Sequence, residues 1–299
     1  MTGPAGRAVE RCAITVVIAT RNRARELDRT LRCLFALPER PHVIVVDNAS
    51  SDGTSESVRR EHPDAEVIAL GRNMGATARN VGVACATSRY VAFSDDDSWW
   101  EPGSLRRAAA VLETHPGLGI VAARVLVGAD GRPDPVNALM AASPLAAGGL
   151  PGPRVLGFLG CAAVVRRTAF LSVGGFSDLL FFGAEEQLLA LDLASAGWSL
   201  AYLEGVTARH WPSDLRDVAG RRSLDQRNRV LIAWMRRPVR VALQDTAALA
   251  RRMGHDPQAR TAFAALALGL PRALRQRRPV PPDVEAQARL LECPPREAR

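Results

Sequence analysis

The sequence predicts an α/β protein in which a mostly parallel central sheet has helices on both faces and is followed by a C-terminal helical extension. Three observations predict this fold class. Short apolar runs rich in β-branched residues alternate with helical patterns through the first hundred residues, which is typical of βαβ units. Polar residues follow the end of each run, and the positive charge is concentrated near the C-terminus. With 299 residues, 47% of them apolar, the chain is long enough to bury a large core.

The first strand is expected at residues 13–19, an apolar run interrupted by one threonine, as in a strand buried on both faces of a sheet. A helix is expected over 25–37, where leucines recur at i, i+4 and i+7. The second strand, at 42–46, ends in the loop 47–54, which is rich in turn formers and helix N-cap residues. These segments form the first βαβ unit.

A third strand is expected at residues 66–70 and a helix at 76–86, separated by a loop that contains two glycines. The fourth strand, at 90–93, is followed by a serine and three aspartates. Parallel strands place their carboxyl ends at one edge of the sheet, and ligands bind beyond that edge. The polar residues after the four strands therefore predict one binding crevice.

Beyond residue 100 the alternation is less regular. The segment 128–157 is rich in alanine, proline and glycine without periodicity, and we expect a long loop over a binding site. The remaining elements are expected as a helix at 105–112, a strand at 119–127, a strand end and short helix within 164–176, a helix at 185–196 and a strand at 199–203.

The formal charge of +8 is distributed unevenly, and all 39 basic residues are arginine. Residues 1–214 have a net charge of −2, residues 215–278 a net charge of +11, and residues 279–299 a net charge of −1. We therefore predict a ligand-binding domain at 1–214, a basic arginine-rich helical extension at 215–278 and a flexible tail at 279–299.

The basic extension suggests a polyanionic partner. Trp234 and Phe263 are its only aromatic residues, so nucleic-acid bases have little to stack on, and we expect no nucleic acid. Apolar residues interleaved with arginines are typical of helices packed on a domain. They are also typical of attachment to an anionic membrane surface, at about 1 kcal/mol per arginine. We favour packed helices and keep an anionic membrane surface as the alternative partner of 215–278.

The cysteines and the apolar runs indicate the compartment. Five cysteines are widely separated without a C-x-x-C pair, which is typical of reduced thiols. The longest apolar runs, 12–19 and 262–270, are shorter than the roughly 18 residues of a membrane span, and the N-terminus shows no signal-peptide pattern. We expect a cytoplasmic protein, with peripheral attachment to the inner face of the membrane as the alternative.

The three consecutive aspartates after the fourth strand are candidate metal ligands. Asp95, Asp96 and Asp97 offer the hard oxygen ligands that Mg²⁺ and Mn²⁺ prefer, and three adjacent like charges are unfavourable without a cation. A polar turn that caps the next helix is the alternative. His210, beyond the strand at 199–203, is a candidate third ligand, although a lone histidine is more often a surface or core residue.

Glu185 and Glu186 begin a helix about ninety residues later. A helix N-terminus stabilises ionised carboxylates, which suits a general base near neutral pH, and an ordinary acidic first turn is the alternative. Arg79, on the helix after the third strand, is placed to reach a pyrophosphate, unless it lies on a solvated helix face. The sequence contains no P-loop and no G-x-G-x-x-G motif.

The order of these motifs is more specific than any one of them. They are VIATRNR at 17–23, VVDNASSDGT at 45–54, NMGATARNVG at 73–82, FSDDD at 93–97, GGF at 174–176 and the acidic helix at 185–198. Together they resemble the inverting glycosyltransferases of family 2, over residues 12–211. The resemblance implies the GT-A fold, a Rossmann-like sheet that binds a nucleotide sugar.

The resemblance also implies roles for individual residues. The residues implied to contact the donor nucleotide are Thr20, Arg21, Asp47, Asn73, Arg79, Asp95 and Asp96. Among them, Asp47 would contact the base, and Arg79 would lie near the base or the phosphates. A divalent metal, Mg²⁺ or Mn²⁺, would be bound by Asp97 most directly and by His210, with Asp95 nearer the ribose. Glu186 would be the catalytic base, and Glu185 would hold the acceptor.

The sequence departs from the family pattern on the helix of the acidic pair. The second acid is glutamate where aspartate is more usual, so Glu185 is the alternative base. The family often continues with Asp-Leu and an arginine three residues further on, whereas Leu188 and Asp192 stand in those places. Contacts of this helix with the acceptor or the donor are therefore left open.

We predict an inverting, metal-dependent transfer of a sugar from a nucleoside diphosphate sugar to an acceptor hydroxyl. UDP is the first choice of nucleotide, with GDP and dTDP as alternatives, and the acceptor is a glycan, a lipid-linked molecule or a small molecule. A nucleotide-sugar-binding protein without catalysis is the main alternative. A sugar-nucleotide pyrophosphorylase is less favoured, because the glycine-rich opening loop and the lysine of that class are absent.

Overall fold

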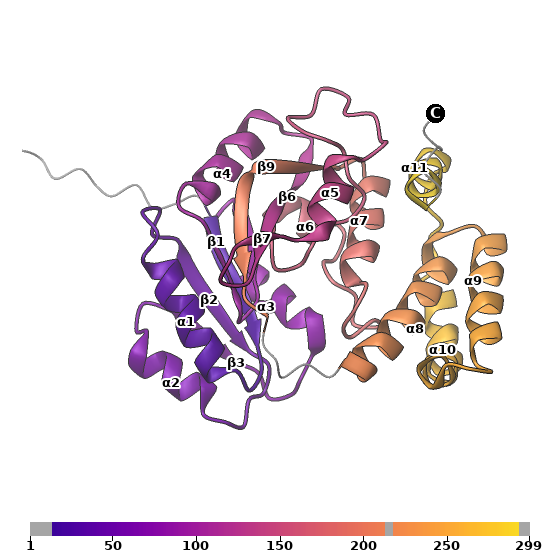
Figure 1. Cartoon of the computed structure of the whole chain (residues 1–299), viewed down its shortest axis with the longest axis horizontal. Helices are drawn as coiled ribbons and strands as arrows, with labels where there is room; N and C mark the ends of the chain where they lie inside the picture. Colours follow the sequence, from indigo (N-terminus) through magenta and orange to yellow (C-terminus); the bar gives the residue numbers. More distant parts are fainter. Residues whose placement is uncertain (1–13, 213–217, 293–299) are drawn as a thin grey trace, which may run out of the picture.

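The computed structural model describes residues 14–212 and 218–292. Its first half alternates strands and helices as expected (Figure 1). The elements are β1 (Ile14–Thr20), α1 (Ala24–Phe35), β2 (His42–Asp47), α2 (Thr54–Glu61), β3 (Glu66–Ala69), a 3₁₀ turn (Gly75–Thr77), α3 (Ala78–Cys85) and β4 (Tyr90–Ser94). Strands β3, β2, β1 and β4 are adjacent in that order and all pair in parallel. The βαβ prediction is confirmed for this half.

The second half of the sheet is mixed: it adds antiparallel strands to the mostly parallel sheet that the sequence predicts. It contains β5 (Ser98–Trp100), α4 (Ser104–Thr114), β6 (Leu118–Val127), β8 (Ala163–Arg166), α6 (Arg167–Ser172), α7 (Glu185–Ser195) and β9 (Ser199–His210). β8 lies between β4 and β6 and is antiparallel to both, whereas β9 is parallel to β6 and antiparallel to β5. A short apolar run has the same pattern in either direction, so the sequence alone could not give the orientation of β8.

The two faces of the sheet bury separate layers of side chains. Val16 and Ile18 pack on one face with the leucines of α1 and with α4, and the intervening Val17 packs on the other face with α3, α6 and α7. This alternation along one strand explains why β1 is apolar throughout. The helices on both faces that the sequence predicts are confirmed.

The segment expected as a long loop over 128–157 contains two short elements, β7 (Arg132–Pro133) and α5 (Pro135–Ala141). Asp134 caps α5 by accepting a hydrogen bond from the Val136 amide at 2.9 Å, and Pro135 occupies the first turn of the helix, where its missing N–H is not needed. The side chain of Asn137 bonds to both backbone groups of Val125 and attaches α5 to β6. The remainder of this segment has no further helix.

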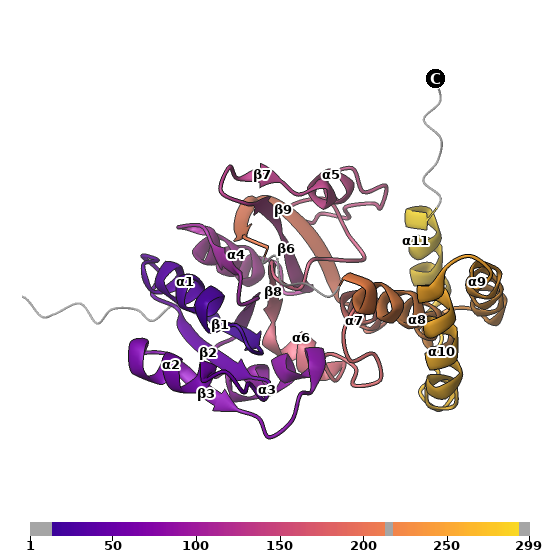
Figure 2. The ribbon, with the colours of Figure 1, turned by 60° about the horizontal axis from the view of Figure 1, so that its bottom comes forward.

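The C-terminal extension is a layer of helices beside α7 (Figures 1 and 2). It consists of α8 (Val218–Arg236), α9 (Val239–Arg252), α10 (Pro257–Arg275) and α11 (Pro282–Glu292). Apolar side chains of all four helices pack with Leu188 and Leu191 of α7 in a third core. Within the described residues, no helix is both long and apolar enough to cross a membrane.

The expected flexible tail from residue 279 is wrong for its first part, because α11 forms there. Val284 and Ala288 of α11 are buried, and Arg237 bonds to Glu285 at 2.6 Å and to Glu292 at 2.5 Å. These long-range contacts supply the stability that a short isolated helix lacks. Residues 293–299, the rest of the predicted tail, lie outside the described residues.

Candidate active site

An open cleft of about 440 Å³ lies beyond the carboxyl ends of β1, β2 and β4. Most of the residues predicted to bind the donor or the metal line it, namely Thr20, Arg21, Asn73, Arg79, Asp95, Asp96 and Asp97. The structure therefore brings together predicted side chains that follow three separate strands, β1, β3 and β4.

Asp47 does not line the cleft. Its carboxylate is 4% exposed and accepts hydrogen bonds from the Ser50 amide at 2.9 Å and from the Ser55 hydroxyl. The next residue, Asn48, lines the cleft instead, and it binds the backbone of the 73–75 loop through Met74 N at 2.6 Å and Gly75 O at 3.0 Å. Asp47 organises the loop after β2, and Asn48 joins that loop to the 73–75 loop at the edge of the cleft.

Asp95 and Asp96 have different environments. Arg79, which is 6% exposed, forms an ion pair with Asp95. Asp96 Oδ2 accepts a hydrogen bond from the Thr20 hydroxyl at 3.0 Å. Burial, followed by the charges of Asp95 and Asp97, raises the pKa of Asp96 to about 7. Ionising all three aspartates therefore costs free energy, and a bound cation would lower this cost.

Asp97, which lines the cleft, lies next to His210. The register of β5 with β9 pairs Ser98 with His210, which places His210 Nε2 3.4 Å from Asp97 Oδ1. A carboxylate oxygen and an imidazole nitrogen at this separation fit two ligands of one divalent cation. The sequence predicted these two residues as ligands, and the pairing of β5 with β9 supplies their proximity.

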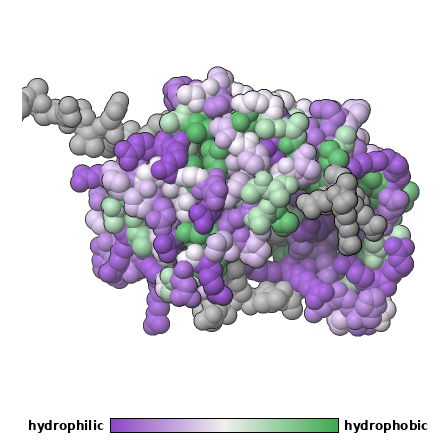
Figure 3. Space-filling model, turned by 45° about the horizontal axis from the view of Figure 1, so that its top comes forward, coloured by the Kyte–Doolittle hydropathy of each residue, from purple (hydrophilic) through white to green (hydrophobic). Residues whose placement is uncertain are grey.

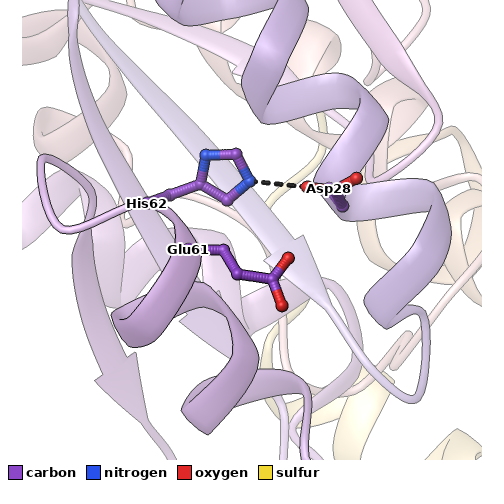
Figure 4. Close-up of side chains that lie close together, drawn as sticks. All are labelled: Asp28, Glu61 and His62. Atoms are coloured by element: carbon purple, nitrogen blue, oxygen red, sulfur yellow. Dashed lines mark hydrogen bonds and ion pairs between the residues drawn. The ribbon is translucent and has the colours of Figure 1, made fainter.

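A second group of candidate ligands lies between α1 and the end of α2 (Figure 4). Among the described residues, Asp28, Glu61 and His62 place ligand atoms within 4.8 Å of one another. His62 Nε2 is 2.9 Å from Asp28 Oδ1, and Arg32 donates to the same oxygen at 3.1 Å. None of the three lines the cleft. Their contacts attach α1 to the end of α2, outside the cleft.

Glu185 is enclosed by the protein. It is 3% exposed, its Oε1 lies 4.0 Å from Arg79 Nη1, and its Oε2 has no hydrogen-bond partner within the described residues. Burial raises the pKa of Glu185, and the nearby Arg79 opposes that rise. Arg79 thus lies between the carboxylates of Asp95 and Glu185, and it links the acidic cluster to the acidic pair.

Glu186 opens into a different cavity, of about 380 Å³, between α7, α8 and α11. Its Oε1 accepts a hydrogen bond from the Gly160 amide at 3.2 Å. Burial of the carboxylate, followed by the charge of Glu185, raises its pKa to about 8. Of the two acids, Glu186 is the one that a ligand in this second cavity can reach.

Several residues of the cleft were missed by the sequence analysis. Besides Asn48, they are Arg23, Phe181, Phe182 and Arg221. Arg221 comes from α8, and its guanidinium lies over the Phe182 ring at 4.9 Å. Arg23 lies in the first motif, which could have indicated it. Nothing in the sequence distinguishes Arg221 from the other arginines of the extension, because only the packing of α8 brings it to the cleft.

The fold and the cleft define a GT-A glycosyltransferase, and comparison with known proteins agrees. The family model described as Glycosyl transferase family 2 matches residues 15–174, which end before the acidic pair. Since this match spans more than half of the chain, the chain belongs to glycosyl transferase family 2. The family and the enzyme class predicted from the sequence are confirmed.

Two curated relatives come from Mycobacterium tuberculosis. An N-acetylglucosaminyl-diphospho-decaprenol L-rhamnosyltransferase is 26% identical over 281 residues, which cover 79% of this chain and 91% of the relative. A pre-mycofactocin glycosyltransferase is 31% identical over 218 residues, which cover 70% of this chain and 45% of the relative. This chain therefore spans less than half of the second relative.

Solved structures share the fold at low sequence identity. The mannosyltransferase PcManGT from Pyrobaculum calidifontis, in complex with GDP-Man and Mn²⁺, has a TM-score of 0.60 at 23% identity and covers 94% of this chain and 79% of that one. S. aureus TarS 1-349, in complex with UDP-GlcNAc, has a TM-score of 0.60 at 18% identity and covers 93% of this chain and 85% of that one. These similarities concern the fold.

Proposed function

We propose that this chain is an inverting, metal-dependent glycosyltransferase that moves a sugar from a nucleoside diphosphate sugar to an acceptor hydroxyl. The main support is one geometric arrangement. The cleft that suits the nucleotide is lined by Asp97, whose Oδ1 lies 3.4 Å from His210 Nε2, and Glu186 lines a separate cavity. The Asp95–Arg79–Glu185 contacts connect the two sides.

The donor occupies the cleft. Thr20, Arg21 and Asn48 provide polar groups for the base and ribose, together with Asn73 and the loop after β2 that Asp47 organises. Arginines 21, 23 and 221 line the same cleft, and guanidinium groups suit the two phosphates. Structural neighbours were crystallised with GDP-Man or UDP-GlcNAc, and UDP stays our first choice, with GDP and dTDP as alternatives.

Asp97 and His210, with Asp95 beside them, would hold the divalent cation, Mg²⁺ or Mn²⁺. When bound, the cation neutralises the charge that develops on the departing diphosphate. Glu186 removes the proton of the acceptor hydroxyl, whose oxygen attacks the anomeric carbon from the face opposite the diphosphate. A single displacement of this kind inverts the anomeric configuration. Base catalysis typically contributes about 10²–10⁴-fold.

The acceptor is proposed to be lipid-linked. One curated relative is named for a lipid-linked acceptor, an N-acetylglucosaminyl-diphospho-decaprenol. The extension exposes Val239 and Leu243 on α9 and Leu268 on α10, and arginines 240 and 260 of the same two helices are also exposed. Exposed apolar and cationic side chains on these helices suit peripheral contact with an anionic membrane, on the cytoplasmic side.

A transfer assay tests the proposal. Wild-type protein is incubated with UDP-, GDP- and dTDP-sugars and Mn²⁺ or Mg²⁺, with a short-chain lipid diphosphate sugar as acceptor, and the product linkage is read by NMR. We expect transfer with inversion from one class of donor and loss of transfer with EDTA. Nucleotide binding without hydrolysis or transfer from any donor would instead favour the alternative, a nucleotide-sugar-binding protein without catalysis.

A further inference from the structure

The C-terminal extension meets the sheet domain close to the start of α7, where the acidic pair lies. Apolar side chains of α7 and α8 share one core, and a hollow with a mainly hydrophilic lining is visible on the side of the C-terminal helices (Figure 3). The segment 181–184 leads into α7 and contributes to two places. Phe181 and Phe182 line the donor cleft, and Ala184 lines the cavity of Glu186.

The backbone of this segment has an unusual conformation. Phe181, Gly183 and Ala184 have φ angles of 64°, 88° and 57°, in the left-handed region that residues with a side chain rarely adopt. The carbonyl oxygen of Ala184 accepts hydrogen bonds from two amides of the first turn of α7, at 3.2 and 3.4 Å. The direction in which the acidic pair leaves the segment therefore depends on the neighbours that keep this conformation in place.

The donor side holds the segment at Phe181. The Ala76 amide donates a hydrogen bond to the Phe181 carbonyl oxygen at 2.6 Å. A Cβ added at Gly75 would collide with the same oxygen, so the missing side chain at this glycine permits the close approach of the two loops. This contact fixes the end of the segment that lines the donor cleft.

Asn228 of α8 holds the other part of the segment. Its side chain is fully buried, and its amide nitrogen donates to the carbonyl oxygens of Leu180, Phe182 and Gly183 at 3.0, 2.9 and 2.5 Å. The neighbouring Arg227 donates to Asn228 Oδ1 at 2.9 Å through Nε. This second contact keeps the amide nitrogen directed at the segment.

We propose that Asn228 is a positioning residue for the sugar transfer, because it fixes the backbone of 180–183 and through it the place of Glu186. This inference rests on the proposed glycosyltransferase function and assigns a part in it to the extension. Asn228 lines neither the donor cleft nor the cavity of Glu186, so it acts through the segment. Since Ala76 holds Phe181 independently, loss of Asn228 should release the acidic pair more than the donor side.

A merely structural role of Asn228 is the alternative, and the same helix offers a matched control. Gln226, two residues earlier on α8, is also a buried amide, 7% exposed. It donates to Asp256, within the extension, at 3.2 Å. Loss of Gln226 should therefore weaken the extension and leave the segment unchanged.

Steady-state kinetics, UDP binding and hydrogen exchange test the inference, at a temperature where all variants are folded. Asn228→Ala should lower kcat for transfer about tenfold or more, while the donor KM and the Kd of UDP with Mn²⁺ stay near the wild-type values. The amides of 182–187 should exchange faster in this variant, measured by mass spectrometry. Gln226→Ala should lower Tm but should keep the kcat and the 182–187 exchange of wild type.

Gly183→Ala perturbs the segment without changing the buried face of α8. The nearest atoms to an added Cβ are 3.6 Å away, in Asp225, so the methyl group has room. The φ of 88° is unfavourable for alanine, and the segment should relax. We expect the same loss of kcat with UDP binding retained, and this variant tests the inference even if Asn228→Ala does not fold.

The inference is overturned if Asn228→Ala and Gln226→Ala have the same kcat, or if kcat and UDP binding fall together in Asn228→Ala. Unchanged exchange of 182–187 in Asn228→Ala also overturns it. Failure of the proposed function has a different signature, the absence of transfer from every donor by the wild-type protein. The exchange measurement needs no turnover, and in that case it still decides whether Asn228 holds the segment.

Discussion

Replacing Glu186 by glutamine should abolish sugar transfer and should stabilise the ligand-free protein at alkaline pH. Glutamine keeps the oxygen that accepts the Gly160 amide hydrogen bond, so the local geometry is preserved. It removes a carboxylate whose pKa is raised from 4.5 to about 8 by burial and by the charge of Glu185. Arg79, which also faces this pair, moderates the rise.

The magnitude follows from the pKa shift. A raised carboxyl pKa means that the folded state prefers the neutral form, so wild-type stability falls as pH rises from about 4.5 to about 8. At 1.36 kcal/mol per pKa unit, the full shift corresponds to about 4–5 kcal/mol above pH 8. Since Glu186 lines a cavity that is open to solvent, we expect a net gain of about 2 kcal/mol for Glu186→Gln. In a protein of this size that gain raises Tm by about 3 °C.

Thermal unfolding at pH 5, 7 and 9 in the absence of metal and nucleotide measures the effect. The Tm difference between Glu186→Gln and wild type should be near zero at pH 5 and largest at pH 9. Glu56→Gln, at an exposed position on α2, should show no such trend. A Tm difference that does not change with pH refutes the reasoning from burial, and full transfer activity in Glu186→Gln refutes the role of Glu186 as the base.

Three further predictions concern the same site. Gly160→Ala should lower kcat at least tenfold with little loss of stability. The added Cβ would lie 2.6 Å from Glu186 Oε1 and would displace that flexible carboxylate. An unchanged kcat in a steady-state assay would contradict this prediction. Arg79→Met should destabilise the fold by about 2 kcal/mol or more above pH 7, because the carboxylates of Asp95 and Glu185 lose the buried cation beside them. Urea unfolding measures this loss. A variant as stable as wild type would show that the ion pairs of Arg79 do not stabilise the fold. His210→Ala should raise the apparent Kd for Mn²⁺ in the presence of UDP at least tenfold, as measured by the thermal stabilisation that Mn²⁺ gives, whereas the Tm without ligand should change little. An unchanged Mn²⁺ titration would show that His210 is not a metal ligand.

Much of the donor half could be predicted from the sequence, because the information is local. The apolar run of β1 with leucines at helical spacing after it specifies a βαβ unit, and each strand end carries its own polar residues. The position of the cleft then follows from the parallel order of four strands. The position of Asn48 in the cleft was missed because Asp47, beside it, carries the charged group. Only the buried contacts with Ser50 and Ser55 show that this carboxylate is engaged within its loop.

The sequence by itself determined the α/β class and the family, and it predicted a cleft at the carboxyl edge of the parallel strands. The tertiary structure decided how distant residues meet. The antiparallel insertion of β8, the register that brings His210 to Asp97, the placement of Arg79 between Asp95 and Glu185, and the folding of α11 onto Arg237 all depend on pairings between residues far apart in the chain. Local periodicity encodes which side of an element is buried, but it does not encode the partner that buries it, and the site depends on those partners.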